Sequence, residues 1–73
     1  MAQSPDHRSI VGKNIRFVRK KAELTLEKLA EKAEMDWTYL SQIERGRENI
    51  SVDKLARIAK ALGIKISDLT SGA

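Results

Sequence analysis

Apolar residues recur at helical spacing along most of this 73-residue chain, whereas the alternation typical of strands is confined to residues 64–66. The second segment shows the pattern best, because Leu26, Leu29 and Ala33 fall at i, i+3 and i+7 and form one apolar stripe. Helices are predicted at about residues 9–21, 26–33 and 37–45, between Ser51 and Gly63, and near 68–71. The expected fold class is all-α, a compact five-helix bundle.

Residues that favour helix ends support these boundaries. Small polar residues that can cap an N-terminus precede the segments: Ser9, Thr25, Asp36, Ser51 and Ser67. Gly46 and Gly63 follow the third and the fourth segment, where glycine commonly ends a helix. Residues 1–8 are polar, contain Pro5 and are expected to be a flexible N-terminal tail, so residues 9–73 form the single domain.

The composition excludes several classes of function. The chain has no cysteine and one histidine, which argues against a metal site, a thiol nucleophile or a serine–histidine triad. Its four glycines are too far apart for a phosphate-binding loop. No cofactor, no small-molecule ligand and no enzyme activity are expected, and the acidic pair Glu27 and Glu31 is interpreted as helix surface. No apolar run spans a membrane and no secretion signal is present, so a cytoplasmic location is expected.

The charge is unevenly distributed. The net charge is +4 and the pI is near 9.7. Residues 8–22 hold six basic residues and no acid, whereas residues 23–36 hold five acids and two lysines. Such segregation fits a protein with one side that faces phosphates. The alternative from charge alone is a solvated surface with accidental clustering.

The third predicted helix has one polar and one aliphatic side. At about 100° per residue, Leu40 and Ile43 share one side, and Trp37 and Tyr39 flank the other. That other side carries the hydroxyl, amide and guanidinium groups of Thr38, Ser41, Gln42 and Arg45. The second and third predicted helices are joined by a short turn, the helix-turn-helix arrangement.

These polar side chains match the chemistry of base recognition in the major groove. Glutamine pairs with adenine N6 and N7, arginine with guanine O6 and N7, and threonine or serine with either. An ordinary solvated surface is the alternative for Thr38, Ser41 and Gln42. Their place on the second helix of the pair, in a basic protein, favours DNA contacts.

A family resemblance covers most of the chain. Residues 24–49, LTLEKLAEKAEMDWTYLSQIERGREN, resemble the helix-turn-helix of the phage repressor/Cro-like family, and the resemblance continues through residues 51–69. Its specific elements are Leu29-Ala30, Leu40-Ser41, Ile43-Glu44-Arg45-Gly46 and LARIAKALGI at 55–64. The size and the segment WTYLSQIERGREN are most similar to controller proteins of restriction–modification systems.

The resemblance implies a function and its partners. It implies a lambda repressor-like domain that binds double-stranded DNA as a homodimer, at a pseudo-palindromic operator, and that blocks or recruits RNA polymerase. Phage-type repressors and some antitoxins share this fold, so they remain open as alternatives to a controller protein. The sign of regulation also remains open.

The resemblance also assigns roles to residues. Thr38 and Gln42 are the main candidates for base readout, with Trp37, Ser41 and Arg45 beside them. Trp37 matches a DNA-facing position, and buried support is an equal alternative. Backbone contacts are expected from Tyr39, Arg47 and Asn49. Arg19 and Glu44 match a structural ion pair between the first and the third helix.

The chain departs from the family pattern at three positions. Leu26 stands where the family often has a glutamine that binds a phosphate, and we expect Thr25 or Arg16 to supply that contact instead. Glu23 and Glu34 stand in turns that commonly carry glycine. A positive φ is costly for other residues, so some adjustment of both turns is expected.

Apolar residues in the C-terminal third are candidates for a dimer interface. They are Ile64, Ile66 and Leu69, with Leu62 and Val52. The alternative is that these residues complete the small core of the monomer. A dimer would read two half-sites about 34 Å apart and so gain specificity that one recognition helix lacks.

Overall fold

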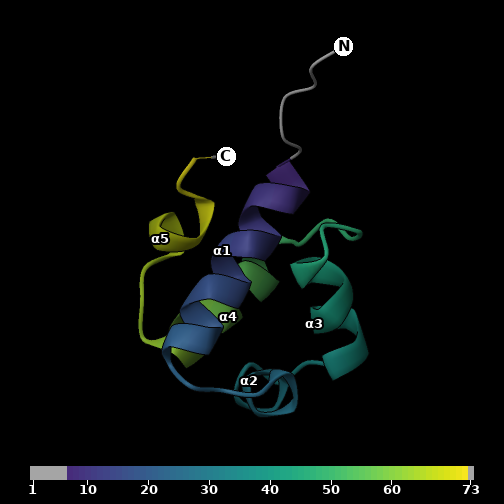
Figure 1. The fold of residues 1–73 in the computed structure, drawn as a ribbon, viewed down its shortest axis with the longest axis vertical. Helices are drawn as coiled ribbons and strands as arrows, with labels where there is room; N and C mark the ends of the chain where they lie inside the picture. Colours follow the sequence, from purple (N-terminus) through teal and green to yellow (C-terminus); the bar gives the residue numbers. More distant parts are fainter. Residues whose placement is uncertain (1–6, 73) are drawn as a thin grey trace.

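Helices account for most of residues 7–72, which the computed structural model describes (Figure 1). They are α1 (His7–Lys21), α2 (Leu26–Lys32), α3 (Trp37–Glu44), α4 (Val52–Leu62) and α5 (Ile66–Thr70). The described residues contain no strand, and the all-α prediction with five helices is confirmed. None of these helices has the length and apolar character needed to cross a membrane.

Three of the predicted N-caps are confirmed. The side chains of Thr25, Asp36 and Ser51 accept hydrogen bonds from backbone N–H groups in the first turns of α2, α3 and α4. Gly46 and Gly63 follow α3 and α4 with φ of +74° and +71°, the left-handed conformation that glycine adopts without strain. The ends of the three middle helices therefore agree with the local sequence.

The predicted caps of the first and last helices are wrong. α1 begins at His7, so Ser9 lies inside it, and residues 7–8 of the predicted tail are helical. The rest of that tail, residues 1–6, lies outside the described residues. Ser67 lies inside α5, because the carboxylate of Asp68 accepts the backbone N–H of Lys65 at 3.1 Å and starts the helix at Ile66.

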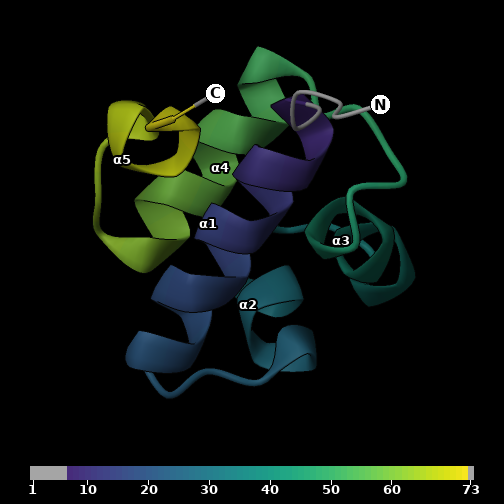
Figure 2. The ribbon, with the colours of Figure 1, turned by 45° about the horizontal axis from the view of Figure 1, so that its top comes forward.

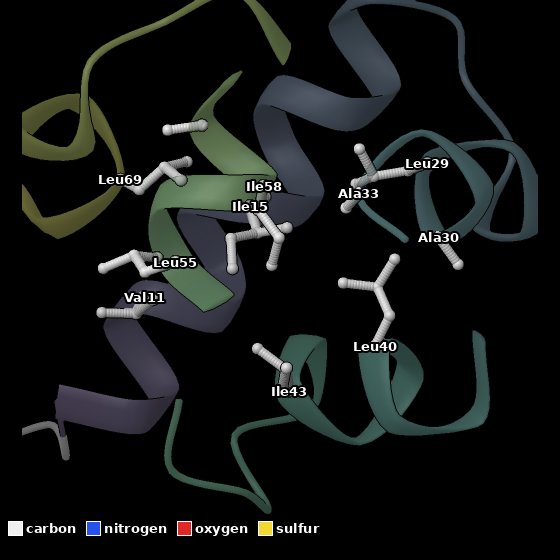
Figure 3. Packing of buried hydrophobic residues seen from close by; sticks show 11 residues of the cluster. Val11, Ile15, Leu29, Ala30, Ala33, Leu40, Ile43, Leu55, Ile58 and Leu69 are labelled. Carbon is white, nitrogen blue, oxygen red and sulfur yellow. The ribbon is translucent and has the colours of Figure 1, made fainter. Parts of the chain in front are cut away.

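Every helix contributes to one core (Figure 3). Its buried members are Val11, Ile15, Leu29, Ala30, Ala33, Leu40, Ile43, Leu55, Ile58, Ala59 and Leu69. Leu69 is 0% exposed, so it completes the core of the monomer and is not free to form a dimer surface. For this residue the prediction of an interface role is wrong.

α1 runs through the middle of the molecule. It packs against α3, α4 and α5. In both views α3 and α5 lie on opposite sides of it (Figures 1 and 2). α3 is therefore separated from α5 by α1.

The turns before α2 and α3 keep left-handed geometry without glycine. Glu23 has a φ of +59° and Glu34 a φ of +56°, so the expected adjustment of these turns is wrong. The surrounding contacts hold the conformation. Arg19 Nη1 donates to the carbonyl oxygen of Leu24 at 2.8 Å, and the N–H of Met35 donates to that of Ala30 at 2.9 Å.

Candidate nucleic-acid interface

The interface is built on the pair α2–α3. Residues 33–36 join the two helices, and the buried side chains of Leu29, Ala30 and Leu40 pack in the shared core. The carboxylate of Asp36 accepts the N–H groups of Thr38 and Tyr39 at 3.0 and 3.3 Å and so fixes the first turn of α3. The short turn and the common core hold α3 at a defined angle to α2.

α3 has a buried and an exposed side, as its sequence predicts. Leu40 and Ile43 are 0% and 1% exposed and point into the core cluster (Figure 3). On the outer side Thr38 and Arg45 are exposed, and Ser41 and Gln42 are half-buried. The polar groups of the four outer residues form one side of α3, which we call the polar face of α3.

Trp37 lies at the start of this helix and is 51% exposed. A tryptophan that supports the core would be largely covered, so the alternative of buried support is wrong. Its side chain is therefore open to solvent at the start of α3.

The segment from Gly46 to Ser51, which we call the α3–α4 loop, directly follows Arg45 at the end of α3. The N–H of Arg47 donates to the carbonyl oxygen of Gln42 at 2.9 Å, and the N–H of Gly46 donates to the carbonyl oxygen of Ile43 at 3.0 Å. These two hydrogen bonds cap the C-terminus of α3. Arg47 and Asn49 are exposed in this loop. The loop therefore exposes two side chains with hydrogen-bond donors directly after α3.

Tyr39 connects α3 to the α3–α4 loop. Its hydroxyl donates to the carbonyl oxygen of Asn49 at 3.1 Å, and its ring lies under the ammonium of Lys54, 4.3 Å from the ring centroid. The sequence interpretation missed Lys54. A cation in the first turn of a helix opposes the usual preference for acids there, and this was the available signal.

Arg19 and Glu44 form the ion pair expected from the resemblance. Arg19 Nε and Nη2 donate to the Glu44 carboxylate at 2.7 and 3.0 Å, and the two side chains are 12% and 6% exposed. Arg19 also holds the carbonyl of Leu24 in the turn before α2. The pair thus fixes the end of α3 to both α1 and the α1–α2 turn.

Gly12 permits the close approach of α1 and α3. A Cβ atom at this position would lie 2.3 Å from the carbonyl oxygen of Ile43 and 2.8 Å from that of Glu44. Sequence reasoning missed this role. A glycine inside a predicted helix, which costs about 1 kcal/mol relative to alanine, was the signal that a packing reason exists.

The two substitutes proposed for the missing glutamine contact lie on α1 and directly before α2. Thr25 is exposed, and its Oγ1 accepts the N–H of Lys28 at 3.1 Å as the cap of α2. Arg16 is exposed on α1, one turn after Gly12, and therefore near the side of α1 that faces α3.

Within residues 7–72 no group of three histidine, cysteine or acidic residues is placed to hold a metal ion.

Comparison with known proteins identifies the family. A model described as helix-turn-helix matches residues 15–69. The chain belongs to this helix-turn-helix family. It is a DNA-binding transcriptional regulator, and its α2–α3 pair is the helix-turn-helix itself.

Two curated relatives show the range of this similarity. The control protein C.BamHI of Bacillus amyloliquefaciens is 41% identical over 63 residues, which cover 85% of this chain and 78% of that protein. The immunity repressor of Bacillus phage phi105 is 47% identical over 57 residues, which cover 78% of this chain and 40% of that protein.

Solved structures share the fold closely. The clp gene regulator ClgR from C. glutamicum superposes with a TM-score of 0.91 at 36% identity, over 96% of this chain and 90% of its own. The restriction–modification controller protein C.AhdI from Aeromonas hydrophila has a TM-score of 0.83 at 31% identity, over 85% of this chain and 94% of its own. The biofilm regulator SinR, solved in complex with DNA, has a TM-score of 0.78 at 35% identity, over 81% of this chain and 95% of its own.

Proposed function

We propose that this protein binds double-stranded DNA sequence-specifically, as a homodimer at a pseudo-palindromic operator, and that it is a controller protein of a restriction–modification system. The observation that supports base readout is the polar face of α3, which lies on the outer side of this helix. Leu40 and Ile43 hold the opposite side of α3 in the core. The loop that follows α3 exposes the hydrogen-bond donors of Arg47 and Asn49. No other described helix combines an outward polar side of this chemistry with the position of a recognition helix.

Base readout is assigned to the polar face of α3. Gln42 can donate to adenine N7 and accept from N6, and Arg45 can bind guanine O6 and N7 with two donors. Thr38 and Ser41 can contact either kind of base edge, and Trp37 can pack against sugars or methyl groups. Thr38 and Gln42 remain the main residues of base readout in this proposal, and Arg45 adds a second side chain capable of bidentate contacts.

Contacts with the DNA backbone are assigned to residues around that face. Arg47 and Asn49 in the α3–α4 loop flank one end of α3, and Arg16 and Thr25 lie on α1 and before α2. Each phosphate contacted by a cation adds affinity through counterion release, which makes binding depend on salt. These contacts position the protein, and the base contacts select the sequence.

Dimerisation is assigned to the side of the molecule that carries α5. Ile66 is 37% exposed, and Ile64 and Leu62 are half-buried near it in sequence. Val52 is 73% exposed at the other end of α4. Because α3 and α5 lie on opposite sides of α1, a dimer joined through α5 places its two α3 helices away from the interface, as two half-sites about 34 Å apart require.

The choice of a controller protein is supported by two of the similar proteins, the control protein C.BamHI at 41% identity and the controller protein C.AhdI at 31% identity. A phage-type repressor is the second candidate, favoured by the higher identity of 47% within the matched region. An antitoxin of the same fold is the remaining alternative. In each case the bound dimer would block or recruit RNA polymerase.

Selection of bound duplexes from a random pool tests the proposal. The expected product is one motif with two-fold symmetry, whose half-sites are centred about one helical turn apart. An asymmetric motif would contradict the homodimer, and a pool without enrichment would contradict sequence-specific binding. Finding the selected motif ahead of restriction and methyltransferase genes would support the controller, whereas a motif in prophage DNA would support the repressor.

A further inference from the structure

Lys54 occupies a position that helix electrostatics disfavour. It lies in the first turn of α4, where the partial positive charge of the helix end favours acids over cations. Its ammonium lies 4.3 Å from the centroid of the Tyr39 ring, well within the range of a cation–π interaction. The attraction to the ring offsets the unfavourable placement, and both side chains are half-buried, which limits screening by water.

The Tyr39 ring in turn holds the α3–α4 loop. Its hydroxyl donates to the carbonyl oxygen of Asn49 at 3.1 Å. At the far end of the loop, Ser51 Oγ accepts the backbone N–H of Lys54 at 3.2 Å. Lys54, Tyr39 and Asn49 thus form a closed set of contacts that joins α3, the loop and the start of α4.

We propose that Lys54 is a positioning residue for DNA binding. Its ammonium orients the Tyr39 ring. The oriented ring in turn holds the α3–α4 loop, with Arg47 and Asn49, in a fixed position relative to the polar face of α3. Lys54 acts through Tyr39 and contacts no phosphate. This inference rests on the proposed DNA function, which assigns backbone contacts to the loop.

A double-mutant cycle in DNA binding separates this role from a direct phosphate contact. Lys54→Met, Tyr39→Leu and the double variant are titrated with the duplex selected from the random pool, over a range of salt concentrations. Lys54→Met is expected to weaken binding about two- to fivefold. The slope of log affinity against log salt is expected to stay unchanged, and the double variant to bind no more weakly than Tyr39→Leu.

Two further variants serve as controls. Lys54→Arg keeps a cation over the ring and is expected to restore wild-type affinity. Lys60→Met removes an exposed lysine in the last turn of the same helix and is expected to leave affinity unchanged. Two results together would overturn the proposal and assign Lys54 to a phosphate. The salt slope of Lys54→Met would fall by about 0.9, and its loss of affinity would add to that of Tyr39→Leu in the double variant.

A measurement without DNA keeps this inference separate from the proposed function. Amide hydrogen exchange is compared between the wild type and Lys54→Met under conditions where both are folded. Faster exchange confined to residues 46–50 is the expected result, because the loop loses one of its restraints. Unchanged exchange in the loop would overturn the positioning role. If the wild type selects no duplex, the proposed function fails. The exchange rates of residues 46–50 still show whether Lys54 restrains the α3–α4 loop.

Discussion

Gln42 is the residue whose place on α3 bears most directly on base selection. It is half-buried on the outer side of α3, opposite the buried Leu40 and Ile43. Gln42→Ala is expected to weaken binding to the selected duplex by about 1–3 kcal/mol and to relax the preference at one base pair in each half-site. Competition between the selected duplex and variants at each position measures this effect. Equal losses on selected and random DNA would reduce Gln42 to a backbone contact.

Arg47 is expected to act on every sequence alike. It is exposed in the α3–α4 loop and its N–H group is bound to Gln42, so its guanidinium extends from a fixed backbone. Arg47→Ala should weaken selected and random duplexes to the same extent and reduce the salt slope by about 0.9. Titrations at several salt concentrations measure the slope. A slope equal to that of the wild type would contradict a phosphate contact.

The sequence was informative about residues whose role follows from local patterning. The inward Leu40 and Ile43 and the outward Thr38 follow from helical periodicity. Leu69 was misassigned because periodicity separates apolar from polar sides, yet it does not tell a core from an interface. Lys54 was missed because a contact between a helix start and an aromatic ring 15 positions earlier leaves no periodic signal.

At the scale of elements, the position of α3 depends on how closely α1 approaches it. Gly12→Ala would place a Cβ atom 2.3 Å from the carbonyl oxygen of Ile43, closer than any real contact of this kind. Alanine is the better helix former by about 1 kcal/mol, yet the clash with rigid backbone outweighs that gain. The free energy of unfolding should fall by about 1–3 kcal/mol, as for other overpacked sites.

Urea denaturation measures this change. Lys13→Ala, an exposed position next to Gly12 on α1, is the control and should change stability by less than about 0.5 kcal/mol. A Gly12→Ala variant as stable as the wild type would show that α1 and α3 can separate without cost.

The helix ends show how far element boundaries follow from sequence. Thr25, Asp36 and Ser51 were predicted correctly because each cap acts on its own first turn. Glu23 and Glu34 were expected to distort their turns on conformational grounds, yet both keep positive φ. Hydrogen bonds across the ends of α1 and α2, such as those from Arg19 Nη1 to the carbonyl oxygen of Leu24 and from the N–H of Met35 to that of Ala30, hold these turns, and the preference of glycine for positive φ does not include them.

At the scale of the whole molecule, the proposed dimer predicts different outcomes for two neighbouring residues. Ile66→Asp places a charge on a residue that is 37% exposed at the start of α5, so the protein should stay folded and become monomeric. Leu69→Asp buries a charge in the core and should unfold the monomer itself. Sedimentation together with circular dichroism distinguishes loss of association from loss of structure.

The matched control for the dimer is Phe17→Asp. Phe17 is 67% exposed on α1, so an acid there adds the same charge outside the proposed interface. The control should sediment as a dimer. If Phe17→Asp dissociates the protein while Ile66→Asp does not, the interface lies on α1 and its assignment to α5 is wrong.

We place the DNA-binding surface on the outer side of α3 and the loop after it. Backbone amide shifts, followed by NMR while the selected duplex is titrated in, locate this surface residue by residue. The largest changes are expected in residues 37–49, with little change at Glu27 and Glu31 on the exposed side of α2. Changes centred elsewhere, with the amides of Thr38 and Gln42 unaffected by saturating duplex, would contradict this placement.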